Sequence, residues 1–192
     1  MKPIMKKLLL LIFVAFTFTS AHGQVFNTGQ TLKKGVFSLG IEPALHIDGG
    51  ANGVILFGHA GYGIKSGLDA GVQVGFGDRQ YFGANLEFAL GNNISLAVGA
   101  HDFGYFGLDG TLNFTIPLKS DLHLYGGIDT DINFIKGTND EGKSETTLQM
   151  PFWAPIGLEV GLSRNMSLLF ESEIALNDPA YHVIGGGLNF YL

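Results

Sequence analysis

The dominant pattern in this sequence is an alternation of apolar residues with small or polar ones. In residues 68–77 and 81–90, every second residue is Leu, Val, Phe or Ala. Successive side chains of a β-strand point to opposite faces, so this period of two predicts strands with one apolar face. Each segment is about as long as a tilted membrane-crossing strand, roughly 9 to 11 residues. Beyond residue 23, no segment sustains a helical period or 18 unbroken apolar residues, and the sequence therefore predicts an all-β chain.

The same pattern continues along the chain and predicts ten strands. They are expected at residues 36–47, 53–64, 68–77, 81–90, 94–102, 105–116, 122–134, 148–162, 166–176 and 180–192. Every second connection is tight, at 65–67, 91–93, 117–121 and 163–165, and most of the others are longer and polar. This asymmetry is typical of membrane barrels, which have short turns at one edge and longer loops at the other. With eight strands, the alternative, two of these segments would be long loops.

The first residues of the chain predict a removed secretory signal at residues 1–23. Lys2, Lys6 and Lys7 precede an apolar stretch at 8–18, and small residues follow it up to Gly23. The apolar stretch is too short to cross a bilayer as a helix, which needs roughly 20 residues. The predicted barrel domain is therefore 24–192.

The composition excludes several classes of function. Without the three signal lysines, eight basic residues face 17 acidic ones, a net charge of −9 that argues against a nucleic-acid partner. The chain has no cysteine, so neither a disulfide framework nor a lipid-attachment cysteine is expected. No motif predicts a cofactor.

The position of the charges predicts which face of the strands points outward. Lys and Arg all lie outside the predicted strands, while carboxylates interleave with glycines on the polar face. These carboxylates are Glu42, Asp69, Glu87, Asp109, Asp129, Asp131, Glu159, Glu171 and Glu173. An enclosed, crowded lumen accounts for small and acidic residues better than open solvent does, so we expect the apolar face to contact lipid. Aromatic residues near the strand ends fit two girdles at the membrane interfaces.

Three of these carboxylates are candidates for holding a cation. If the turn centre near Lys119 sets the register, Asp109 and Asp129 lie opposite each other and Asp131 follows on the same face. Like charges at that spacing repel. We therefore expect the group to share protons or a cation, or to face hydrated lumen.

The histidines provide little support for catalysis. His101 with Asp102, or His182 with Asp178, would be the residues of an enzyme acting at the outer rim. Neighbouring residues of a strand point to opposite faces, which weakens the first pair. The sequence predicts that the protein is not an enzyme.

The last predicted strand carries a resemblance to a known class. Residues 184–192 place Ile, Gly, Leu, Phe and Leu on one face up to the final Leu192, and this resembles the closing strand of bacterial outer-membrane β-barrels. The resemblance implies a signal for the assembly machinery, formed by Gly186, Leu188, Phe190 and Leu192. It also implies an outer-membrane location with lipid as partner, and a seam between the last strand and residues 36–47.

A closed antiparallel up-and-down transmembrane barrel is therefore the predicted fold. The expected function is a structural or passive-permeability role, with a narrow, cation-preferring channel if the barrel conducts at all. One alternative is a surface interaction module that uses the external loops, above all the polar stretch 136–145. Another is a soluble periplasmic barrel with apolar residues inside, which binds a lipophilic ligand.

Overall fold

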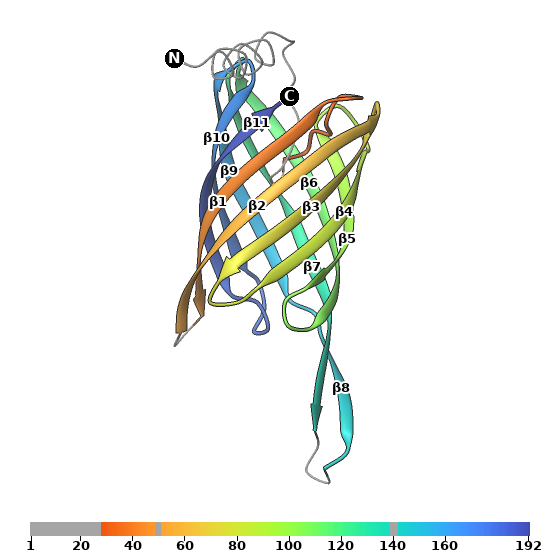
Figure 1. Ribbon diagram of the computed structural model, residues 1–192. Helices are drawn as coiled ribbons and strands as arrows, with labels where there is room; N and C mark the ends of the chain where they lie inside the picture. The colour runs from red at the N-terminus through yellow and green to blue at the C-terminus, as the bar shows by residue number, and fades with distance from the viewer. Residues whose placement is uncertain (1–27, 49–50, 139–141) are drawn as a thin grey trace, which may run out of the picture.

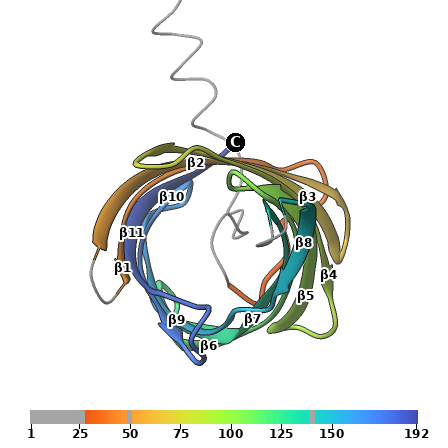
Figure 2. The same cartoon turned by 90° about the horizontal axis from the view of Figure 1, so that it is seen from below.

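The computed structural model describes residues 28–48, 51–138 and 142–192; the predicted signal lies outside these ranges. The described chain forms antiparallel strands, ten of which close into a barrel (Figures 1 and 2). The strands are β1 (Phe37–Asp48), β2 (Ala51–Lys65), β3 (Leu68–Gly77), β4 (Tyr81–Ala89), β5 (Ile94–Asp102), β6 (Phe106–Lys119), β7 (Leu122–Thr138), β8 (Ser144–Gln149), β9 (Phe152–Ser163), β10 (Met166–Ala175) and β11 (His182–Tyr191). Within these ranges no helix is long and apolar enough to span a membrane.

Closure of the barrel follows the order of the chain. Each strand pairs with the next along the sequence, except that β7 pairs with β9 within the barrel wall and with β8 beyond it. The seam joins β1 to β11, with a register that runs from Ser38 opposite Tyr191 to Ile47 opposite His182. The predicted ten-stranded fold and its seam are confirmed.

One predicted loop is largely strand. Most of the stretch 135–147 extends β7 to Thr138 and forms β8, and the two strands pair from Asn133 opposite Gln149 to Thr138 opposite Ser144. This hairpin projects beyond the barrel rim (Figure 1). The sequence did not predict this hairpin, because its residues are polar on both faces and lack the apolar–polar alternation of the strands in the barrel wall.

We call the two edges of the barrel the turn end and the loop end. The turn end holds the tight connections, and both the first residues of β1 and the end of β11 lie there (Figure 1). The loop end carries the β7–β8 hairpin and the β10–β11 connection at 176–181. The asymmetry is smaller than expected, because β1 and β2 pair up to Asp48 opposite Ala51 and shorten the first loop.

The two faces of the wall differ in the predicted sense. Large apolar side chains lie exposed on the outside, for example Ile41 at 47%, Val72 at 49% and Phe170 at 53%. Polar side chains such as Ser38, Ser95 and Asn189 are fully buried inside. The soluble barrel with an apolar interior is therefore wrong. A closed wall leaves no unpaired edge within the ring, as a strand protein in lipid requires.

Candidate functional site: the barrel lumen

On the side of β7, β9, β10 and β11, the lumen near the turn end is filled by side chains. Tyr125 and Leu169 pack together there, with exposures of 0% and 1%. Next to them, the Tyr191 hydroxyl donates to Glu159 Oε1 over 3.1 Å, and Asn189 Nδ2 donates to the same hydroxyl over 3.0 Å. Buried polar groups are stable when hydrogen-bonded in this way. This part of the lumen is packed core.

A segment before the first strand crosses the turn end beside this packed region. This N-terminal segment, residues 28–36, runs across the mouth from β6 to β11. Gly29 N–H donates to Thr115 Oγ1 on β6 over 2.8 Å, and Leu32 N–H donates to Asp69 Oδ2 on β3 over 2.6 Å. The Leu32 side chain, 1% exposed, packs against Tyr191 of β11.

Above this floor lies a cavity of about 250 Å³. Its lining extends from Tyr105, Pro179 and Tyr181 at the loop end down to Asp69 and Glu87. None of the Lys or Arg residues that the structure describes is among its lining residues. The cavity is therefore an acidic cup that meets the outside at the loop end.

All nine predicted lumen acids lie on inward-facing strand positions, and eight of them line this cavity. The eight are Glu42, Asp69, Glu87, Asp109, Asp129, Asp131, Glu171 and Glu173. Glu159 instead lies in the packed region, where the His123 ring contacts it at 3.3 Å.

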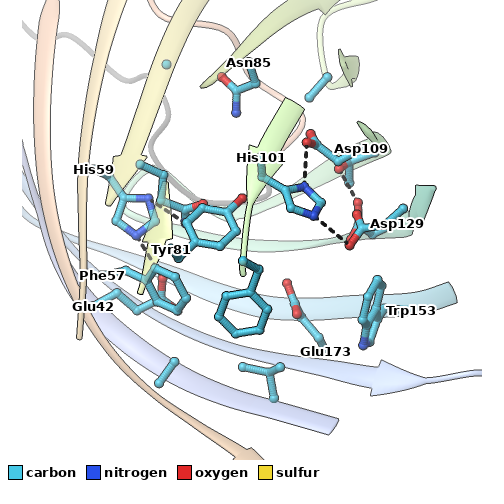
Figure 3. Close-up of a pocket in the computed structure, with 18 of the residues that line it drawn as sticks. Glu42, Phe57, His59, Tyr81, Asn85, His101, Asp109, Asp129, Trp153 and Glu173 are labelled. Carbon is cyan, nitrogen blue, oxygen red and sulfur yellow. Dashed lines mark hydrogen bonds and ion pairs between the residues drawn. The ribbon is translucent and has the colours of Figure 1, made fainter. Parts of the chain in front are cut away.

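Two further histidines pair with the cavity acids. His59 Nε2 lies 3.1 Å from Glu42 Oε2, and His101 Nδ1 lies 3.2 Å from Asp109 Oδ2 (Figure 3). These pairs were missed because their members are 8 to 17 residues apart and meet only across neighbouring strands. Three histidines, His46, His59 and His101, line the cavity against eight carboxylates.

The predicted register of the aspartates is wrong by two residues. Asp109 lies opposite Asp131, and Asp129 lies opposite Thr111, whose hydroxyl donates to it. The cause is the position of the turn, which lies at Ser120 and Asp121 beyond the assumed centre near Lys119. An irregularity between Pro117 and Lys119 then shifts the pairing by one residue. Pro has no N–H to give to a ladder, so an irregular turn at this position is expected.

The cation candidates do not form a metal centre. His101 Nε2 lies 3.7 Å from Asp131 Oδ2, and it also contacts Asn133 Oδ1 at 3.2 Å. Within the described ranges, no group of three or more His, Asp or Glu side chains has a geometry that could hold a metal ion.

Several aromatic residues expected in the interface girdles point into the lumen instead. Tyr81, Trp153 and Tyr181 line the cavity with Phe103, and Tyr191 is buried near the turn end. The predicted position of these residues near the strand ends is correct, but position along a strand does not define whether a side chain faces the lumen or the outside. Their position in the period of two did contain that signal, because Tyr81 alternates with the outward Phe82.

The histidine pairs considered for catalysis are not formed as proposed. His101 faces inward and contacts Asp109, whereas Asp102 is exposed and accepts the Gly104 N–H over 2.9 Å. His182 is exposed, and its Nδ1 accepts the Ala175 N–H over 3.1 Å.

Comparisons with known proteins bear on the fold. No family model and no curated protein matches the chain. The solved structure of the NanC porin matches with a TM-score of 0.50 at 9% identity and covers 80% of this chain and 100% of that one. The chain has the fold of a bacterial outer-membrane β-barrel.

Two other matches have lower TM-scores. The outer-membrane protein Ail of Yersinia pestis has a TM-score of 0.46 at 13% identity, over 83% of this chain and 100% of that one. The N-terminal barrel domain of Pseudomonas aeruginosa OprF has a TM-score of 0.42 at 12% identity, over 83% and 98%. At such identities the likeness extends to the fold alone.

Proposed function

We propose that the chain is exported under its signal at residues 1–23, inserted by the outer-membrane assembly machinery, and serves as a restrictive, cation-preferring barrel. The observation that carries this proposal is the cavity itself, which is lined by carboxylates and by no Lys or Arg of the described chain. A structural role in the membrane is compatible with the same barrel.

The physical reason for the preference is electrostatic. Carboxylates on a narrow path with low-dielectric walls concentrate cations and repel anions. Asp109, Asp129 and Asp131 lie together on β6 and β7, and Glu173 projects from β10, so a permeating ion meets acids from two sides.

We expect the residues at the floor of the cavity to limit the ionic current through the barrel. Residues 28–36 and the packed region around Tyr125 occupy the turn end below the cavity. We therefore expect a low conductance and not that of an open porin.

Ion selectivity in a planar bilayer under a salt gradient tests the proposal. The reversal potential is expected to show cation preference, and D131N and E173Q are each expected to reduce that preference several-fold. A unit charge at about 4 Å contributes on the order of 1 kcal/mol even in bulk water, close to a factor of five. D121N and E145Q, acids at exposed positions outside the cavity, serve as matched controls. An anion-selective reversal potential would contradict the proposal.

A second role is supported by the β7–β8 hairpin. Its paired strands extend beyond the rim as a defined element, and every described residue from Lys136 to Gln149 is exposed. β8 pairs only with β7 among the described strands, so its outer edge is open to another chain. External loops of this kind carry recognition in many proteins.

Removal of the hairpin tip tests this surface role. Replacement of residues 137–145 by Asn-Gly closes a two-residue turn on Lys136 and Thr146, which already lie opposite each other. We expect the barrel to assemble, with unchanged heat-modifiable migration on gels, while binding to cells or matrix is lost. Equal binding by the shortened and full chains would exclude the hairpin as the adhesive element.

A further inference from the structure

We propose that the loop-end cavity binds a small organic cation, an ammonium or guanidinium group on a flat apolar body. This inference rests on the proposed cation preference and names the chemical class that the cavity selects. Its size, about 250 Å³, lies just below the roughly 300 Å³ at which sites for drug-sized ligands begin. The ligand is therefore expected to be no larger than a substituted single ring.

One wall of the cavity is a continuous set of rings. Tyr81 is central: its ring lies 5.5 Å from that of Phe57, 5.6 Å from the nearly parallel ring of His101, and 5.8 Å from that of Phe103 (Figure 3). A second aromatic pair, Trp153 and Tyr181, lies on β9 and before β11 with its rings 6.1 Å apart. Ring faces attract cations and bury flat apolar groups.

Carboxylates face the same space as the rings. Asp129 and Glu173 project from β7 and β10 toward the centre of the cavity (Figure 3). An ammonium group held among these carboxylates and over an aromatic face gains both ionic and cation–π attraction in a partly desolvated site.

The protein already places a cation of its own on this aromatic cluster. The Arg79 guanidinium lies 5.5 Å from the centre of the Phe103 ring, at the loop end. Phe103 is itself 7% exposed and in contact with Tyr81. The cluster thus already contacts a guanidinium, and its rings Tyr81, His101 and Phe103 line the cavity.

An independent feature at the floor points to a ligand. Asn113 lines the cavity and is only 1% exposed, yet neither its amide nitrogen nor its amide oxygen has a hydrogen-bond partner among the described residues. A buried amide left unsatisfied costs about 1–3 kcal/mol. A ligand with both a donor and an acceptor would satisfy it.

The same geometry disfavours a bare metal ion. Within the described ranges no three His, Asp or Glu side chains converge as metal ligands do. The acids are spread around the wall between aromatic rings, an arrangement that suits a charge carried on an apolar framework better than a compact ion.

The only tryptophan of the chain provides the assay. Trp153 lines the cavity, so its fluorescence in the refolded full chain in lipid nanodiscs should respond saturably to benzylammonium. Benzyl alcohol and benzoate are neutral and anionic probes of similar shape and are expected to bind at least about fivefold more weakly, since one lost ionic contact is worth about that factor. E173Q and D131N should weaken benzylammonium binding, whereas E145Q should not.

These binding experiments test the organic-cation site separately from the proposed ion selectivity. Cation-selective currents without a saturable benzylammonium response would overturn the binding site and leave the proposed function standing. Equal responses to benzylammonium and benzyl alcohol would also overturn it, because the carboxylates would then have no part in binding. Displacement of benzylammonium by calcium at comparable concentrations would assign the site to metal ions and contradict the inference.

Discussion

A chain that begins at Lys33 is expected to conduct several-fold more current than one that begins at Gln24. The truncation removes residues 24–32, of which Thr28 to Leu32 belong to the segment that crosses the turn end. Gly29 and Leu32 are held there by the inward-facing Thr115 and Asp69. Without them the acidic cavity would open to both sides of the membrane.

The truncation should leave the barrel wall intact. Gly35 and Val36 remain and pair with Gly63, with N–H to O distances of 2.7 and 2.9 Å, so the entry to β1 is kept. The reversal potential should retain its sign, because the eight acids that line the cavity lie on strands that the truncation leaves in place. Single-channel recordings of the two chains measure both quantities.

A milder variant separates the segment from the rest of the chain. T115V removes the acceptor for the Gly29 N–H with almost no change of volume and is expected to increase the frequency of openings without reaching the conductance of the truncated chain. Identical recordings from all three proteins would mean that the packed region around Tyr125, and not residues 28–32, limits the current.

The variant G157A is expected to lower the free energy of unfolding by about 1–3 kcal/mol, the usual cost of overpacking a tight interior. Gly157 on β9 lies directly opposite Tyr125 on β7, and the tyrosine ring covers it. A methyl group at this position would meet Cζ and the hydroxyl of Tyr125, and it would lie 2.6 Å from the carbonyl oxygen of Phe170.

The contacts of Tyr125 hinder movement of its ring away from a methyl group at residue 157. Its side chain is 0% exposed, packs on Leu169 and donates from its hydroxyl to the Phe170 carbonyl over 3.4 Å. Urea unfolding in lipid vesicles measures the loss of stability. G110A is the matched control, because no atom lies within 4 Å of a methyl group added there.

A double variant identifies the cause. If the ring overlap produces the loss, G157A should cost much less in a Y125A background, with a remainder due to the Phe170 carbonyl. Equal stability of G157A and the unchanged chain would show that Tyr125 can turn away, and the lumen at this level would then be less rigid than its burial indicates.

Local sequence determined the wall of this barrel. Residues 68–77 and 94–102 are strands as predicted, because a strand with lipid on one side and lumen on the other must alternate at every position, and each segment shows this without reference to its neighbours. For the same reason the nine carboxylates could be assigned to the lumen from their parity alone.

The contents of the lumen were decided by tertiary structure. The N-terminal segment shows no alternation, and its partners Asp69 and Thr115 lie 37 and 86 residues from Leu32 and Gly29 in the sequence. The pairing of Asp109 with Asp131 depended on the position of the turn at Ser120 and Asp121 and on one irregularity near Pro117, neither of which the spacing of residues determined. The period of two indicates which face of a strand a side chain occupies. The contacts of the N-terminal segment, the strand register and the cavity instead depend on which distant residues meet when the barrel closes.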